Sequence, residues 1–139
     1  MDQSVLFFFA AMIIVGGLLF AVISLNKKGG RRIDIDRYRS KWLSVEQQLQ
    51  RDQPASFHLC VINADKLLDQ ALVDKGVHGK TMAERLKSVS AQLTARNDVW
   101  LAHKMRNKVA HDIDARITYE DARAALAGFK RALKDIGAI

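Results

Sequence analysis

Apolar and polar positions divide the chain sharply near residue 26. Between Val5 and Leu25 no residue is charged, and Ser24 is the only residue with a polar side chain. A run of about 20 apolar residues is long enough for a helix to cross the roughly 30 Å hydrocarbon core of a bilayer. The pattern therefore predicts that residues 1–25 form a transmembrane anchor, which contacts the membrane through residues 5–25.

Beyond that segment, apolar residues recur at spacings of three and four, which is typical of helices that bury one face. In residues 34–53 they form one narrow stripe, made of Tyr38, Trp42, Val45 and Leu49. We therefore expect a juxtamembrane amphipathic helix in this range. Three positions for it stay open: docked on the following domain, paired with a second copy, or beside the membrane.

Residues 54–139 show broader apolar faces and predict a bundle of packed helices. Pro54 suits the first turn of a helix, and Gly76 suits a helix end. No segment alternates strictly between apolar and polar residues, so no strand is expected. The predicted fold class is all-α, with one N-terminal transmembrane helix followed by a bundle of four helices, or five if the amphipathic helix docks. The helices of the bundle are expected at 54 to about 75, 82 to about 97, 98 to about 111 and 119 to about 136.

Two short sequences predict where helices begin. Thr81 precedes Glu84 by three residues, which is the spacing of a capping box, and the segment from Thr118 to Asp121 has the same character. Asp98 is a further expected cap. These signals separate the last three predicted helices.

Basic residues flank only one end of the apolar segment. Lys27, Lys28, Arg31 and Arg32 follow it within a predicted basic linker at 26–33, and no basic residue precedes it. Because Lys and Arg are retained on the cytoplasmic side, we expect a single-pass protein of the inner (cytoplasmic) membrane with its C-terminal domain in the cytoplasm. A cleavable signal peptide is disfavoured, since it would have a basic start, a shorter apolar core and small residues at its cleavage site.

The charge balance is basic, which fits either an anionic partner or helix surfaces that are simply solvated by charged side chains. The net charge is +7, and Asp2 is the only charged residue before Lys27, so the part that follows carries +8. Attraction to nucleic acid phosphate is one interpretation, and contact with anionic lipid headgroups is another. The single cysteine, Cys60, permits no internal disulfide and fits a reducing compartment.

The segment from Trp100 to His111 carries the clearest candidate chemistry. Asn107 and His111 are four residues apart and share a helical face, and the long side chain of Arg106 can reach the same region. An arginine fork binds phosphate, and a histidine can take the proton of a ribose 2′-hydroxyl. These three residues are therefore candidates for RNA cleavage without a metal ion. The competing interpretation is structural, with His111 at a helix C-terminus and Arg106 paired with Asp98 or Asp112.

The sequence Arg106-Asn107-Lys108-Val109-Ala110-His111 resembles the Arg-x4–6-His motif of the HEPN superfamily, and the resemblance covers about residues 54–136. It implies an all-α bundle that forms a homodimer, with two motifs facing one cleft. It also implies a metal-independent endoribonuclease with Arg106 and His111 as catalytic residues and Asn107 in support. An early helix of the family often carries an acidic residue that faces the site, a role that Asp65 or Asp69 would have here.

Three lysines near the motif are candidates for holding the RNA backbone: Lys104, Lys108 and Lys80. No metal and no cofactor is expected, because the histidines lack ligand partners at metal spacing and Gly79-Lys80-Thr81 lacks the first glycine of a phosphate-binding loop. The alternative to an RNA enzyme is a non-catalytic helical module that binds an unidentified protein at the membrane face.

Overall fold

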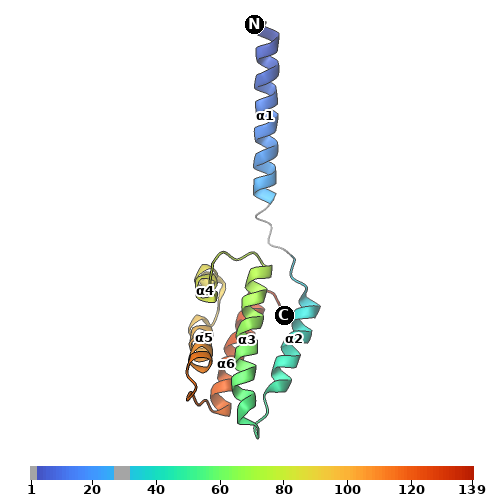
Figure 1. The fold of residues 1–139 in the computed structure, drawn as a ribbon. Helices are drawn as coiled ribbons and strands as arrows, with labels where there is room; N and C mark the ends of the chain where they lie inside the picture. Colours follow the sequence, from blue (N-terminus) through green and yellow to red (C-terminus); the bar gives the residue numbers. More distant parts are fainter. Residues whose placement is uncertain (1–2, 27–31) are drawn as a thin grey trace. The chain divides into compact units, whose positions relative to one another are not determined.

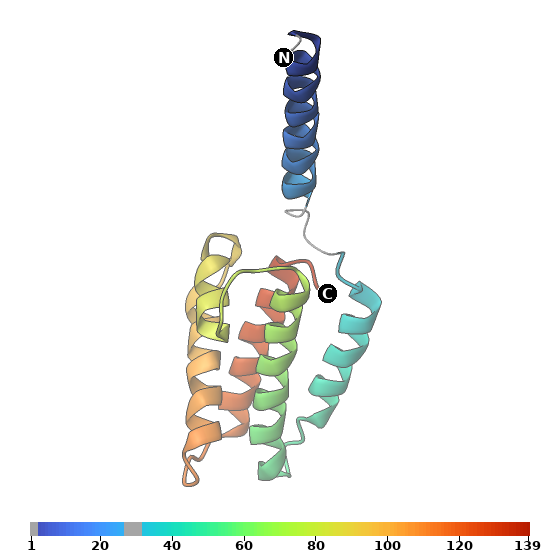
Figure 2. The same ribbon diagram turned by 45° about the horizontal axis from the view of Figure 1, so that its top comes forward.

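The computed structural model describes residues 3–26 and 32–139, which belong to two separate compact units. The first contains a single helix, and the second contains all the remaining elements (Figures 1 and 2). Most of the predicted basic linker, residues 27–31, lies outside the described residues. Each unit is described by itself.

Helix α1 spans Gln3–Asn26 and forms the first unit. Its segment Gln3–Val22 has a mean hydropathy of 2.8, and none of that segment is buried. An all-round apolar surface of this kind has no polar face to present to water. The helix is thus long and apolar enough to cross a membrane.

The second unit is an all-helical bundle, and no strand occurs in the described part of the chain, as the sequence predicts. Its elements are α2 (Ile35–Gln48), α3 (Pro54–Asp74), α4 (Met82–Ser88), the short 3-10 helix η1 (Ser90–Gln92), α5 (Arg96–His111) and α6 (Tyr119–Asp135). Helix α3 lies at the centre and packs against α2, α5 and α6 (Figures 1 and 2). The buried core consists of residues between Tyr38 and Ala138, so the bundle has a core of its own.

Helix α2 packs on α3 and is part of the bundle. Tyr38, Trp42 and Val45 from the predicted stripe are at most 5% exposed. The Tyr38 hydroxyl donates to Asp74 Oδ2 over 2.6 Å at the end of α3. Of the three open positions for this helix, the structure shows docking, because the stripe matches an apolar face of α3. The predicted boundary between 34–53 and 54–139 therefore separates two helices of one unit.

Helix α3 ends where the sequence places its stop. Gly76 has φ +79°, a conformation that residues with a Cβ rarely adopt, and the N–H of Val77 donates to Leu72 O. The Lys75 ammonium donates to Ile136 O over 2.6 Å, which ties the C-terminal ends of α3 and α6 together.

The expectation of one helix from 82 to about 97 is wrong. Helix α4 ends at Ser88, η1 follows, and α5 begins at Arg96. The connection between α4 and α5 buries Val89 and Leu93 in the core. It also brings Thr94 to the end of α6, where Asp135 accepts from the N–H and the hydroxyl of Thr94. Asp98 lies in the first turn of α5 and does not cap it.

Helix α6 is held at both its start and its middle. Thr118 and Asp121 form a reciprocal capping box, and the backbone N–H of Thr118 that donates to Asp121 lowers the pKa of this carboxyl. A Cβ on Gly128 would lie 2.9 Å from the carbonyl oxygen of Asp98, so α6 approaches α5 more closely than alanine permits. The caps and this close approach fix α5, which carries the candidate site.

Candidate functional site

Two of the three predicted catalytic residues belong to one buried polar cluster. Asp65 of α3 is 3% exposed, and its Oδ1 lies 2.7 Å from Nδ1 of His103 on α5. Asp65 Oδ2 forms an ion pair with Arg106 Nε at 3.3 Å, without the geometry of a hydrogen bond. Arg106 therefore pairs with a carboxylate from another helix, and not with Asp98 or Asp112.

Asn107 closes this cluster into a ring. Arg106 Nη1 donates to Asn107 Oδ1 over 3.0 Å, and Asn107 Nδ2 lies 3.4 Å from His103 Nε2. Since the amide oxygen faces the guanidinium, the amide nitrogen faces the imidazole, which then has its proton on Nδ1 toward Asp65. We call Asp65, His103, Arg106 and Asn107 the polar ring.

A second carboxylate, one turn further along α3, holds the beginning of α4. Arg85 contacts Asp69 Oδ1 through Nε and Nη2, both at 2.8 Å, and its Nη1 donates to the carbonyl oxygen of Gly79. Gly79 has φ +150°, and a Cβ there would lie 2.7 Å from Arg85 N. Only glycine permits this close approach of the loop to α4.

The polar ring and the Asp69–Arg85 pair line one pocket of about 520 Å³ between α3, α4 and α5. Its lining also includes two lysines, Lys66 and Lys80. In the described part of the chain neither lysine ammonium forms an ion pair, whereas Arg85 and Arg106 each neutralise one carboxylate. The pocket thus has an excess of positive charge and is suited to an anion.

The structure brings together five of the eight predicted site residues. Asp65, Asp69, Lys80, Arg106 and Asn107 line the pocket. Lys104 and Lys108 are exposed on α5, and His111 is exposed at the last position of the same helix; none of the three lines the pocket. Within one chain, then, His111 does not line the pocket that Arg106 lines.

Three residues of the pocket with titratable side chains, His103, Lys66 and Arg85, were not predicted as site residues from the sequence. His103 lies three residues before Arg106 and four before Asn107, so it shares their helical face, and this spacing could have identified it. Lys66 adjoins Asp65 in the sequence. No neighbouring residue in the sequence indicates a role for Arg85, because its partners Asp69 and Gly79 belong to another helix and to a loop.

The described residues offer little for a thiolate nucleophile or for a bound metal ion. Burial raises the pKa of the Cys60 thiol to about 11, so the thiol stays protonated at neutral pH. Among residues 3–26 and 32–139, no group of three or more His, Cys, Asp or Glu side chains is arranged to hold a metal ion.

No protein-family model matches this chain, and neither a curated protein nor a solved structure matches it.

Proposed function

We propose that this protein is a membrane-anchored, HEPN-like domain that binds RNA in the pocket between α3, α4 and α5. The observation that carries the proposal is the position of Arg106, whose guanidinium is held in the pocket wall by Asp65 and Asn107. A fixed planar fork beside unpaired lysines is suited to a phosphodiester. Lys66 and Lys80 supply the charge that attracts the backbone.

Cleavage requires a second chain in this proposal. His111 is outside the pocket of its own chain, and the family resemblance implies a homodimer in which two motifs face each other. His111 of one copy would take the 2′-hydroxyl proton, and Arg106 would stabilise the charge on phosphorus as the bond from O2′ to P forms and the bond from P to O5′ breaks. Solvent water would protonate the departing 5′ oxygen.

Helix α1 would place this activity at the inner membrane. Its length and apolar surface support a transmembrane anchor, and the basic residues that follow it in the sequence support a cytoplasmic bundle. RNA at the cytoplasmic membrane surface would then be the substrate.

The cleavage assay uses the full chain in lipid nanodiscs, single-stranded RNA and EDTA. We expect products with 2′,3′-cyclic phosphate ends, and we expect Arg106→Ala and His111→Ala to reduce the rate by at least about 100-fold. His78→Ala, at an exposed histidine outside the pocket, is the matched control and should leave the rate unchanged. RNA binding without cleavage by a chain shown to be dimeric would contradict the catalytic part of the proposal.

A non-catalytic interaction module is the second candidate, and one observation favours it. A groove of about 510 Å³ between α5 and α6 is lined mostly by apolar side chains, including Leu101, which is 62% exposed. A protein helix with an apolar face would fit such a groove. Binding of that kind would change little with salt, whereas RNA binding weakens steeply as salt rises.

A further inference from the structure

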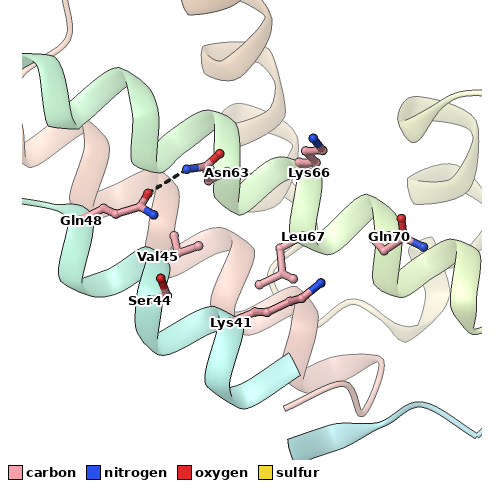
Figure 3. A pocket seen from close by; sticks show the side chains of 8 residues that line it. All are labelled: Lys41, Ser44, Val45, Gln48, Asn63, Lys66, Leu67 and Gln70. Carbon is pink, nitrogen blue, oxygen red and sulfur yellow. Dashed lines mark hydrogen bonds between the residues drawn. The ribbon is translucent and has the colours of Figure 1, made fainter. Parts of the chain in front are cut away.

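We call the pocket between α3, α4 and α5 the RNA pocket. A second cavity shares Lys66 with it. It is a groove of about 270 Å³ between α2 and α3, lined by Lys41, Ser44, Val45 and Gln48 from α2 and by Asn63, Lys66, Leu67 and Gln70 from α3 (Figure 3). We call it the α2–α3 groove. The candidate function described above does not use it.

The lining of this groove has a distinct chemistry. It contains two lysines, three amides and a hydroxyl, but no carboxylate. In the RNA pocket two carboxylates neutralise two arginines, whereas in the groove Lys41 and Lys66 form no ion pair with any described residue. Cations and amides without an acid are suited to a phosphate and to the polar edges of a sugar or base.

The amides of the groove retain hydrogen-bonding capacity. Asn63 Nδ2 donates to Gln48 Oε1 over 2.8 Å, which holds both side chains across the groove (Figure 3). That bond leaves the Gln48 nitrogen and the Asn63 oxygen without a side-chain partner among the described residues. Gln70 is committed to Asp74, to which its nitrogen donates over 2.9 Å. Gln48 from α2 and Asn63 from α3 therefore offer a free donor and a free acceptor on the two sides of the groove.

Lys66 connects the two cavities because of its position on α3. Successive residues of a helix are rotated by about 100°, so Asn63, Leu67 and Gln70 share one face while Asp65 and Asp69 share another. Lys66 falls between these faces and lines both cavities. Figure 3 shows Lys41 reaching from α2 toward α3, while the Lys66 ammonium points away from α2.

We infer that the α2–α3 groove is a second RNA subsite, which binds the nucleotide next to the one held at Arg106. The inference rests on the proposed function. Lys41 binds the backbone in the groove, Lys66 binds it where the strand crosses α3, and Gln48 and Asn63 contact the sugar or the base edge. The domain thereby takes a strand of several nucleotides that crosses α3 at Lys66, and a single phosphate fills only part of the site.

The test measures binding of a single ribonucleoside 5′-monophosphate and of a single-stranded RNA octanucleotide to residues 32–139 over a range of salt. This part forms a compact unit with its own core. Each phosphate contact on a single strand contributes about 0.7 to the slope of log K against log salt. We expect Lys41→Ala to lower the slope for the octanucleotide by about 0.7 and to leave that for the mononucleotide, which reaches one subsite only, unchanged.

The matched control is Lys134→Ala, which removes the same charge from an exposed position on α6 outside both cavities. It should change neither slope. If the octanucleotide binds and depends on Arg106 while Lys41→Ala behaves like the control, the second subsite is refuted and the proposed function stands. If neither the mononucleotide nor the octanucleotide binds, both fail together. A Lys41→Ala effect confined to vesicles of anionic lipid would refute the RNA subsite in favour of a membrane contact.

Discussion

At the scale of single residues, the polar ring shows how a buried acid is stabilised and how it orders its neighbours. Asp65 is almost fully buried, and an unpaired buried carboxylate is costly. It contacts His103 at one oxygen and Arg106 at the other, and Asn107 joins these two partners. The ring thus fixes the direction of the Arg106 guanidinium before any ligand arrives, which reduces the entropy that binding would cost.

Replacement of Asp65 by asparagine tests the ring. The change keeps the size of the side chain and removes the charge that Arg106 and His103 contact, so we expect the free energy of unfolding to fall by about 2–3 kcal/mol. Urea denaturation of residues 32–139 measures it.

Asp69→Asn is the matched control, one helical turn away. Asp69 is 33% exposed at its side chain and pairs with Arg85, so solvent screens the interaction and the loss should stay below about 1 kcal/mol. Equal losses in the two variants would show that Asp65 has no special part in the bundle.

At the scale of elements, the residues that begin and end helices were largely predictable, and the connection between α4 and α5 was not. Gly76, Thr81 and Thr118 act within a few residues of themselves, so the sequence reports them directly. The break after Ser88 is accompanied by a hydrogen bond from Thr94 to Asp135, 41 residues further along the chain, and local spacing does not reveal such a contact.

Helix α1 gives the prediction that belongs to this scale. If it is an uncleaved anchor, the chain expressed in bacteria stays with the membrane pellet in alkaline carbonate, and its intact mass includes the first residues of the sequence. The physical reason is the apolar surface of a 20-residue segment, none of which is buried. Deletion of residues 1–31 should move the bundle to the soluble fraction. A mature chain that begins beyond residue 26 would identify a signal sequence instead.

At the scale of the whole molecule, the sequence predicted the fold class but only part of the candidate site. An all-α bundle follows from helical periodicity, which each segment carries for itself. The docking of α2 stayed open because a narrow stripe such as Tyr38 and Trp42 fits a bundle, a second copy or a membrane equally well. The structure decides it by burying these side chains against α3.

The candidate site also contains two kinds of residue: some belong to a local sequence motif, and others join it only through contacts between helices. Arg106 and Asn107 form a local motif, and both line the pocket. His103 and Arg85 enter it through contacts with α3, from 38 and 16 residues away, which no spacing along the chain reveals. His111 satisfies the motif in sequence, yet it is exposed beyond the pocket of its own chain.

The central claim, that Arg106 presents its guanidinium to RNA phosphate, is tested most directly by fluorescence anisotropy with labelled single-stranded RNA and residues 32–139. We predict that Arg106→Ala weakens binding at least about tenfold, or about 1.4 kcal/mol, and lowers the salt slope by about 0.7. Arg106→Lys, which keeps the charge but loses the fork, should weaken binding while retaining the slope. Arg131→Ala, at an exposed arginine on α6, should change the affinity less than twofold. Equal losses in the Arg106 and Arg131 variants, or binding that does not respond to salt, would contradict the account.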